Sequence, residues 1–371
     1  MRNKTIDIAR GLAIILMCIG HAYCPRILQD FIYMFHMAFF FITSGYFFNK
    51  EKSITQPWEF IVKRIKGLYI PFVTWGISFT FLHNIFLDLK LLTPESHYYD
   101  IKETLWKAFT TNTRFITTEE MMGPYWFFSC LFYVSTFSLS LFFVSNKFFK
   151  KRWIEGLSFI IFYIIGFVIL YTKDENNYDI IIRTLIISFL FYIGYLWNKY
   201  NNRIKYNRIG FALSTSILII GVLSPYNFIN IAILEFENPL LFLIYSLSGT
   251  YMLMCSSKYI EKYIEFLKRP LSYIGSNTLI ILLTNYLCLR FFNLIRAYIV
   301  NYKGHPNTTS TNNLDWYWWI LCTIFMIILP LCLNYIITMG KEIIFKKGSI
   351  ISHKFEEQSY NLIYINMNSP I

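Results

Sequence analysis

The residues of this sequence that could carry chemistry are ionisable side chains inside two long apolar runs near its start. Asp7, Arg10 and His21 belong to the run that begins at Ile6, and His36 belongs to the next run. Ionisable groups are costly within a lipid bilayer, so those that occur there usually face a protein interior or a wet cavity. A neutral imidazole is the usual general base of enzymes near neutral pH. These residues therefore predict an acid–base site between two membrane helices.

Helical spacing places three of these residues on one side of the first helix. His21 lies eleven residues after Arg10 and fourteen after Asp7. At about 100° per residue, these offsets return to within roughly 20° and 40° of the same direction. If this helix runs outward, His21 lies about 16 Å above Arg10, and His36, early in the returning helix, falls at a comparable depth. We therefore expect His21 and His36 to line one cavity, with the cation of Arg10 below them.

Most of these residues also have a structural interpretation. Asp7 and Arg10 are three residues apart and fit an ion pair at a helix start equally well. An intramembrane histidine such as His36 can be a hydrogen-bonded packing residue. Ser44 and the glycine after it favour close helix packing over a nucleophile, because no G-x-S-x-G elbow accompanies them. The alignment with Arg10 favours a functional role for His21.

The composition is that of a protein that crosses a membrane many times. The chain has 371 residues, 55% of them apolar and 15% charged, whereas soluble domains have about 25% charged residues. We expect an all-α fold with about ten transmembrane helices. Their expected positions are 6–23, 31–48, 68–89, 125–145, 154–171, 180–197, 209–224, 239–257, 273–295 and 316–338. The organisation expected is a membrane domain over residues 1–340 and a cytoplasmic tail over residues 341–371.

Charge and cysteine content restrict the partners. The net charge of +12 would suggest nucleic acid in a soluble protein. Here the basic residues fall between apolar runs, mostly in alternate connections, so the positive-inside rule accounts for them and places both termini in the cytoplasm. The number of cysteines, seven, is odd, and no two of them form a CxxC motif. They predict neither a disulfide framework nor a metal site.

Five stretches of the sequence resemble the integral-membrane acyltransferase-3 family, and chiefly its fucose-4-O-acetylase-like and polysaccharide O-acetyltransferase members. In order, they are DIARGLAIILMCIGHA, FHMAFFFITSGYFF, KRIKGLYIPF at 63–72, GPYWFFSCLF at 123–132 and LSYIGSNTLIILLTNYL at 271–287. The resemblance implies a bacterial inner-membrane enzyme. It would move an acyl group, usually acetyl from cytoplasmic acetyl-CoA, to a hydroxyl of a sugar or glycan.

The resemblance also implies roles for residues of the first helix. Arg10 and His21 match the family's N-terminal arginine and its histidine, which is regarded as catalytic. His21 would act as general base or as transient acyl carrier, and His36 is expected beside it in the catalytic group. Arg10 would hold a donor oxygen or stabilise a developing oxyanion. The family often ends its I-G-x-x-[ST]-L helix with a histidine, but Asn285 stands here, so no histidine is inferred at that position.

A basic cluster before the third span would bind the CoA phosphates. Its residues are Lys63, Arg64 and Lys66. The family often has an R-x-x-R pair there, whereas Gly67 stands three residues after Arg64, which leaves the donor contacts open. Positive-inside charge alone accounts for Lys63 and Lys66 equally well. Trp126, which matches the aromatic residue of the family's P-x-W-F segment, and Asp7 are expected near the acceptor, although Trp126 also fits an interfacial aromatic belt.

Two other classes of function remain open at this stage. A saccharide or lipid-linked sugar exporter would also need many spans and intramembrane charge. Transporters commonly contain inverted repeats with helices broken in matched positions, and the sequence shows no such symmetry. A purely structural membrane subunit leaves the alignment of Arg10 with His21 unexplained. The sequence therefore favours an O-acyltransferase.

Overall fold

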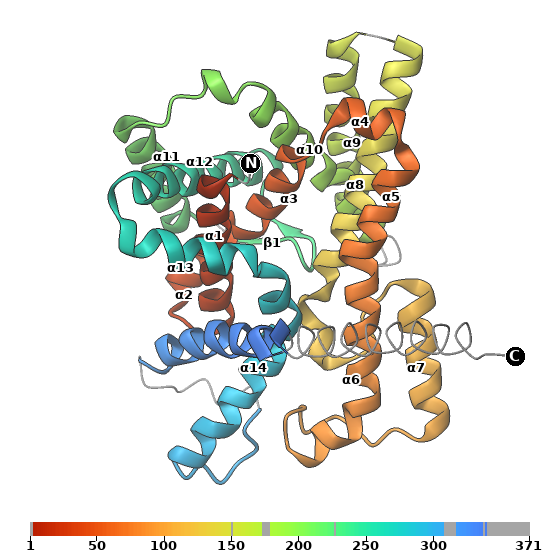
Figure 1. Ribbon diagram of the computed structural model, residues 1–371, viewed down its shortest axis with the longest axis vertical. Helices are drawn as coiled ribbons and strands as arrows, with labels where there is room; N and C mark the ends of the chain where they lie inside the picture. The colour runs from red at the N-terminus through yellow and green to blue at the C-terminus, as the bar shows by residue number, and fades with distance from the viewer. Residues whose placement is uncertain are drawn as a thin grey trace, which may run out of the picture.

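The computed structural model describes residues 3–149, 151–172, 179–225, 228–307, 317–336 and 338–339 (Figure 1). The first part of the chain forms α1 (Lys4–His21), α2 (Arg26–Tyr33), α3 (His36–Tyr46), α4 (Lys50–Thr55), α5 (Pro57–Arg64), η1 (Ile65–Tyr69), α6 (Ile70–Asp88), α7 (Ile101–Arg114), η2 (Glu120–Tyr125), α8 (Trp126–Val144) and η3 (Ser145–Phe149). The expected tail, residues 341–371, lies outside the described residues.

The second part of the chain is also helical. It forms α9 (Arg152–Thr172), α10 (Asp179–Lys199), η5 (Asn201–Arg203), α11 (Arg208–Leu223), β1 (Ile229–Asn230), β2 (Glu235–Phe236), α12 (Pro239–Tyr263), α13 (Glu265–Ser276), α14 (Thr278–Ile299) and a last helix, Trp318–Ile336. The two short strands pair antiparallel, with Ile229 opposite Phe236. The all-α prediction is therefore confirmed.

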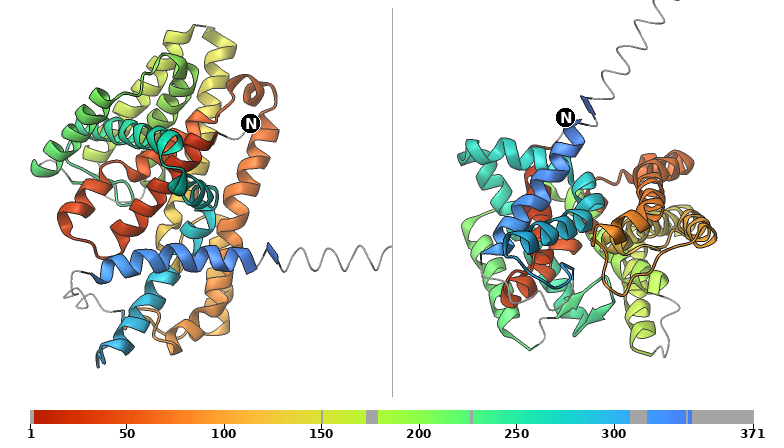
Figure 2. Two further views of the ribbon diagram at one scale, coloured as in Figure 1. Left: turned by 60° about the vertical axis from the view of Figure 1, so that its left-hand side comes forward. Right: turned by 90° about the horizontal axis from the view of Figure 1, so that it is seen from below.

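Within the described residues, eight helical stretches are long and apolar enough to cross a membrane. They are Arg26–Tyr46, Pro57–Asp88, Glu120–Phe149, Trp153–Thr172, Asp179–Lys199, Pro239–Tyr263, Thr278–Ile299 and Trp318–Ile336. The other two predicted spans correspond to α1, whose 18 residues include Lys4, Asp7 and Arg10, and to α11, which has 16 residues. In Figure 1 and in the left view of Figure 2, the last helix lies crosswise to α6, which runs vertically. The count of ten stays a prediction.

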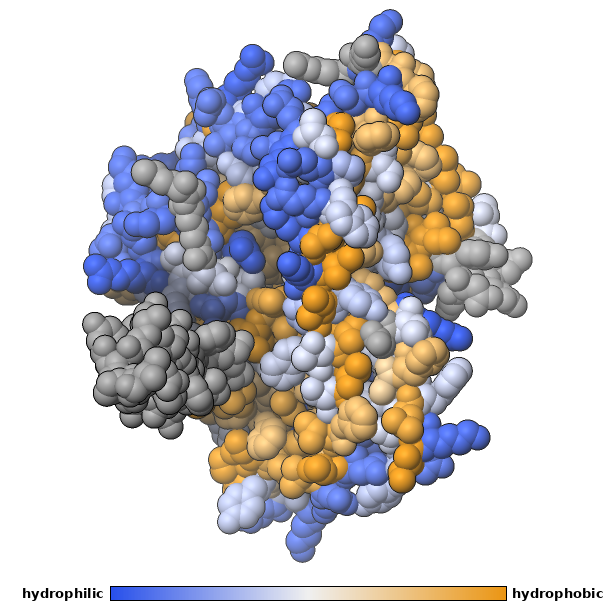
Figure 3. Space-filling view, turned by 45° about the vertical axis from the view of Figure 1, so that its right-hand side comes forward, coloured by the Kyte–Doolittle hydropathy of each residue, from blue (hydrophilic) through white to orange (hydrophobic). Residues whose placement is uncertain are grey.

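Large apolar side chains cover much of the outer surface. Ile164 and Val168 of α9 and Leu213 and Ile220 of α11 are more than half exposed. Figure 3 shows apolar residues over a wide part of one face and hydrophilic residues gathered toward one end. Extended exposed apolar surface of this kind marks contact with lipid or another apolar partner. The protein is therefore an integral membrane protein.

Three predicted spans differ in detail from the structure. The predicted helix 31–48 is interrupted because Phe35 leaves the helical conformation, at φ −145° and ψ −21°, between α2 and α3. The predicted helix 273–295 is interrupted at Asn277, between α13 and α14. The predicted helix 68–89 starts earlier, because α5, η1 and α6 follow one another without a gap over Pro57–Asp88. Sequence periodicity did not reveal the break at Phe35, since apolar residues surround it, whereas the break at Asn277 lies in the polar run Gly275-Ser276-Asn277-Thr278.

Close backbone contact joins α3 to α10. A Cβ at Gly45 would lie 1.9 Å from the carbonyl oxygen of Phe191, and one at Gly194 would lie 1.9 Å from that of Ile42. Only glycine allows backbones to approach this closely, as in small-residue interfaces of other membrane helices. The packing role predicted for Gly45 is confirmed. The contact fixes α3, and with it His36, against the α8–α10 part of the molecule.

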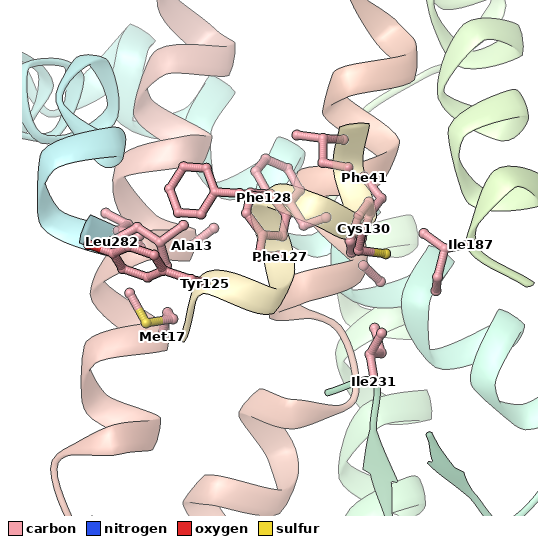
Figure 4. Packing of buried hydrophobic residues seen from close by; sticks show 14 of the residues in the cluster. Ala13, Met17, Phe41, Tyr125, Phe127, Phe128, Cys130, Ile187, Ile231 and Leu282 are labelled. Atoms are coloured by element: carbon pink, nitrogen blue, oxygen red, sulfur yellow. The ribbon is translucent and has the colours of Figure 1, made fainter. Parts of the chain in front are cut away.

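The buried core is rich in aromatic residues. Figure 4 shows Phe127 and Phe128 of α8 close to the aromatic ring of Tyr125 and to Phe41 of α3. The Tyr125 hydroxyl donates a 2.6 Å hydrogen bond to the carbonyl of Leu283, which ties the start of α8 to α14. The seven cysteines carry free thiols. This packing brings α1, α3, α8 and α14 together around the site described next.

Candidate functional site

One face of α1 lines two adjoining cavities. Arg10, Ile14 and Met17 line a cavity of about 340 Å³, here called the arginine cavity. Met17 and His21 line a second cavity of about 260 Å³, here called the histidine cavity. These four residues follow one another at spacings of four, three and four, the pattern of a single helix face. The predicted alignment of Arg10 with His21 is present, and both side chains face cavities.

The histidine cavity brings together five parts of the chain. Its walls are Met17 and His21 of α1; Tyr33, His36 and Met37 of α2 and α3; Gly123, Pro124 and Trp126 at the start of α8; Ile229, Asn230, Ile231 and Ala232 around β1; and Leu282 and Tyr286 of α14. The structure therefore places His21, His36 and Trp126 around one space, as the sequence predicted. Its polar and aromatic walls suit a small polar ligand.

His21 presents its imidazole to this space without a protein partner. Among the described residues, no hydrogen bond joins its ring nitrogens to another group. Its ring centroid lies 6.2 Å from those of Tyr33 and Tyr286. Packing against two aromatic side chains restricts the orientation of the ring and leaves its nitrogens available to a substrate. This is the arrangement that a general base or an acyl carrier requires.

His36 has a hydrogen bond on one ring nitrogen and, among the residues that the structure describes, none on the other. Its Nδ1 donates a 2.8 Å hydrogen bond to the carbonyl of Ile32, across the break between α2 and α3. A carbonyl oxygen only accepts, so the hydrogen lies on Nδ1 and the lone pair on Nε2. The ring centroid lies 5.2 Å from that of Tyr33. His36 therefore combines the two interpretations of the sequence, a hydrogen-bonded packing residue and a second imidazole beside His21.

Two arginines from different helices line the arginine cavity. The Arg10 Nη2 donates a 2.8 Å hydrogen bond to the hydroxyl of Thr278 at the start of α14. The Arg64 Nη2 donates a 3.2 Å hydrogen bond to the hydroxyl of Ser44, and its guanidinium lies 4.9 Å from the Phe60 ring centroid. The Arg64 guanidinium has five N–H donors, so the bond to Ser44 leaves donors for a ligand. The cavity is suited to anionic or carbonyl oxygens.

The predicted basic cluster separates into different environments. Arg64 lines the arginine cavity and also a neighbouring cavity of about 260 Å³. Lys63 lines that neighbouring cavity, and its exposed Nζ donates a 2.7 Å hydrogen bond to Glu59. Lys66 is exposed. It lines none of these three cavities, nor a fourth cavity of about 680 Å³ beside Lys50 and Glu155. Arg64 is therefore the member of the cluster that the fold directs toward Arg10.

Two further sequence expectations concern Asp7 and Asn285. Asp7 is buried where α1 meets α13, with its carbonyl oxygen against Gly275, and it lines none of the four cavities. Asn285 is fully buried, and its Nδ2 donates to the Cys18 thiol at 3.6 Å. The next residue, Tyr286, reaches the histidine cavity instead. The geometry thus gives Asp7 no contact with the space expected to hold the acceptor.

Several cavity residues escaped the sequence analysis because they are apolar or aromatic in an apolar chain. Met17 lies on the same helix face as Arg10 and His21, and this spacing was the available signal. Tyr33 lies three residues before His36 and faces the same space.

Arg183 of α10 was also not singled out from the sequence. It donates a 2.9 Å hydrogen bond to the Ala232 carbonyl, and its guanidinium lies 5.8 Å from the Trp126 ring centroid. Arg183 therefore contacts two residues of the cavity wall, Ala232 and Trp126, without lining the cavity itself.

Comparison with known proteins gives one match. A family model described as an acyltransferase domain matches residues 3–335, which include α1 to α14 and most of the last helix. No curated protein and no solved structure matches the chain. Residues from α1, α3, α5, α8 and α14, which enclose both cavities, all fall within the matched range.

Proposed function

The chain belongs to the acyltransferase-3 family of membrane acyltransferases, and we propose that it moves an acetyl group from cytoplasmic acetyl-CoA to a hydroxyl of a cell-surface glycan or lipid-linked sugar. The observation that carries the proposal is the pair of adjoining cavities on one face of α1. One cavity holds two arginines and the other holds two histidines. In a bacterium the protein would lie in the cytoplasmic membrane.

The arginine cavity is proposed as the donor site. Coenzyme A carries phosphates and a pantetheine arm whose amide oxygens accept hydrogen bonds. Arg64, bonded to Ser44 and shared with the neighbouring cavity, would bind a phosphate, because a guanidinium fork suits that group. Arg10, bonded to Thr278 and deeper along α1, would bind an oxygen of the arm or of the thioester. The two arginines would thus orient the thioester toward the histidine cavity.

The histidine cavity is proposed as the acceptor site and the place of transfer. The acceptor hydroxyl gives its proton to the His21 imidazole as its oxygen attacks the thioester carbonyl. The carbon–sulfur bond then breaks, an ester carbon–oxygen bond forms, and the proton passes from the imidazolium to the CoA thiolate. The products are the acetylated sugar and free CoA. A base placed in this way contributes about 10² to 10⁴-fold to the rate.

A transient acyl-enzyme uses the same residue in a different order. The imidazole nitrogen attacks the thioester, CoA leaves as its thiol, and the sugar hydroxyl then takes the acetyl group from the ring. The Nε2 of His36 would then accept the hydroxyl proton and return it to the His21 ring as the acetyl group leaves, which regenerates both neutral imidazoles. The aromatic walls, Tyr33, Trp126 and Tyr286, would pack against the sugar ring in both routes.

A transfer assay separates this function from saccharide export. The purified protein is incubated with acetyl-CoA labelled in the acetyl group and with a panel of glycan and lipid-linked sugar acceptors. Label on an acceptor, or on the protein in the absence of an acceptor, is the expected result. Failure with every acyl-CoA and every acceptor, together with sugar movement across proteoliposomes that contain the protein, would overturn the proposal in favour of export.

A further inference from the structure

Three apolar side chains, here called the neck, lie between the two cavities. Met17 of α1, Met37 of α3 and Leu282 of α14 are the residues that line both cavities. Met17 is fully buried and Leu282 is 7% exposed. Figure 4 shows Met17 and Leu282 near each other, where α1 faces α14. Because the neck is built from three different helices, it widens only if a side chain shortens or a helix moves.

The position of the neck along α1 separates the two chemical groups. Met17 lies seven residues after Arg10 and four before His21. At 1.5 Å per residue, these offsets place it about 10 Å from the level of Arg10 and about 6 Å from that of His21. A donor held by Arg10 and Arg64 therefore reaches His21 only by passing its acyl end through the neck. This step rests on the proposed function.

We propose that the neck of Met17, Met37 and Leu282 selects a short-chain acyl-CoA, of two or three acyl carbons, and holds the coenzyme back in the arginine cavity. The histidine cavity has a volume of about 260 Å³ and has to hold the acceptor as well. A longer chain would compete with the acceptor for that space. In an apolar pocket, one methylene group changes the rate by about 10- to 200-fold. The three residues determine specificity and take no part in the proton transfers.

Enlarging the neck tests this selection. Leu282→Ala and Met37→Ala each remove apolar volume at the neck. The specificity constant kcat/KM is measured for acetyl-, butyryl- and hexanoyl-CoA with each full-length variant. We expect the wild-type enzyme to favour acetyl over hexanoyl by at least about 100-fold. Each neck variant should lower that ratio by at least about tenfold, because a longer chain now passes.

The chain offers matched controls for both substitutions. Leu279 lies three residues before Leu282 on α14 and lines only the arginine cavity. Leu279→Ala should change the rates of all donors alike and leave their ratio unchanged. Met34 lies three residues before Met37, is fully buried and lines none of the four cavities. Met34→Ala reports the effect of removing a buried methionine as such.

A substitution that enlarges a side chain of the neck tests the proposal even if the alanine variants do not fold. Met37→Phe keeps the apolar bulk and narrows the passage. It should lower acetyl transfer by at least about tenfold and leave the affinity for CoA unchanged, because the coenzyme stays in the arginine cavity. The same chain-length ratio in wild type, neck variants and controls would overturn the inference while transfer itself persists. Absence of transfer from every donor in the wild type would instead contradict the proposed function.

Discussion

Two intramembrane histidines of this protein have opposite surroundings. His21 faces a cavity, and no hydrogen bond joins its ring to another group in the described part of the chain. His83 of α6 is buried, with both nitrogens engaged: Nδ1 shares a 2.7 Å hydrogen bond with the Glu119 carboxyl, and Nε2 donates a 3.0 Å bond to the His97 carbonyl. The Tyr99 ring stacks on it at a centroid distance of 3.4 Å.

The comparison shows that a position in an apolar helix does not distinguish a histidine that faces a cavity from one that is bonded within the protein. Both residues lie in apolar helices, and the same cost of burial applies to each. At His83 the protein meets that cost with its own hydrogen bonds and a stacked ring. At His21 the hydrogen-bonding capacity is left for a ligand. We therefore expect the functional histidine to be the one whose ring nitrogens have no hydrogen bond within the described residues.

The largest expected effect is the loss of transfer in His21→Ala. The rate should fall by about 10² to 10⁴-fold, because the variant has no base or acyl carrier in the histidine cavity. Initial rates with labelled acetyl-CoA measure the loss. Thermal unfolding and CoA binding should stay close to wild type, since the ring supports neither. An active His21→Ala enzyme would show that His21 is not the catalytic residue.

The His83→Ala variant tests whether His83 has a structural role. Removing one partner of this buried, bonded pair leaves the Glu119 carboxyl with the long 3.4 Å bond from the Tyr99 hydroxyl and should destabilise the protein by about 3 to 5 kcal/mol. Unfolding in detergent measures the loss. The transfer rate per folded molecule should stay near that of wild type. A fully stable His83→Ala variant with a greatly reduced rate would show that this histidine is functional as well.

His36 should respond in an intermediate way. His36→Asn retains a side-chain donor for the Ile32 carbonyl, whereas His36→Ala leaves that carbonyl without it. Stability should fall by about 1 kcal/mol in the alanine variant and by less in the asparagine variant. Both variants lack the open Nε2, so both should transfer acetyl about tenfold more slowly. Equal rates in wild type and His36→Asn would assign this residue to packing alone.

The smallest expected effect distinguishes two members of the basic cluster. Arg64→Ala should raise the KM for acetyl-CoA by about tenfold or more, since a charge-assisted hydrogen bond contributes about 1.5 to 3 kcal/mol. Lys66→Ala, in which an exposed cation outside the four cavities is removed, should leave the KM within about twofold. Equal KM values for the two variants would show that Arg64 does not bind the donor and contributes only to membrane orientation.

Periodicity and composition predicted the helical fold and the alignment of Arg10 with His21, because both follow from local rules along one helix. They did not predict the neck, since Met17 and Leu282 are ordinary apolar residues until α1 meets α14. The burial of Asp7 depends on the approach of α13, which the sequence does not encode locally. His83 was not singled out, because its partners Glu119 and His97 lie in the segment between α6 and α8, whose packing against α6 local periodicity does not predict.

A cryo-electron microscopy structure with an unreactive thioether analogue of acetyl-CoA bound would test the central claim most directly. The account predicts the coenzyme in the arginine cavity and the acyl carbon beyond the neck, within about 3.5 Å of a His21 ring nitrogen or of an acceptor oxygen bonded to it. An analogue whose acyl end lies elsewhere, with His21 separated from it by protein, would contradict the account.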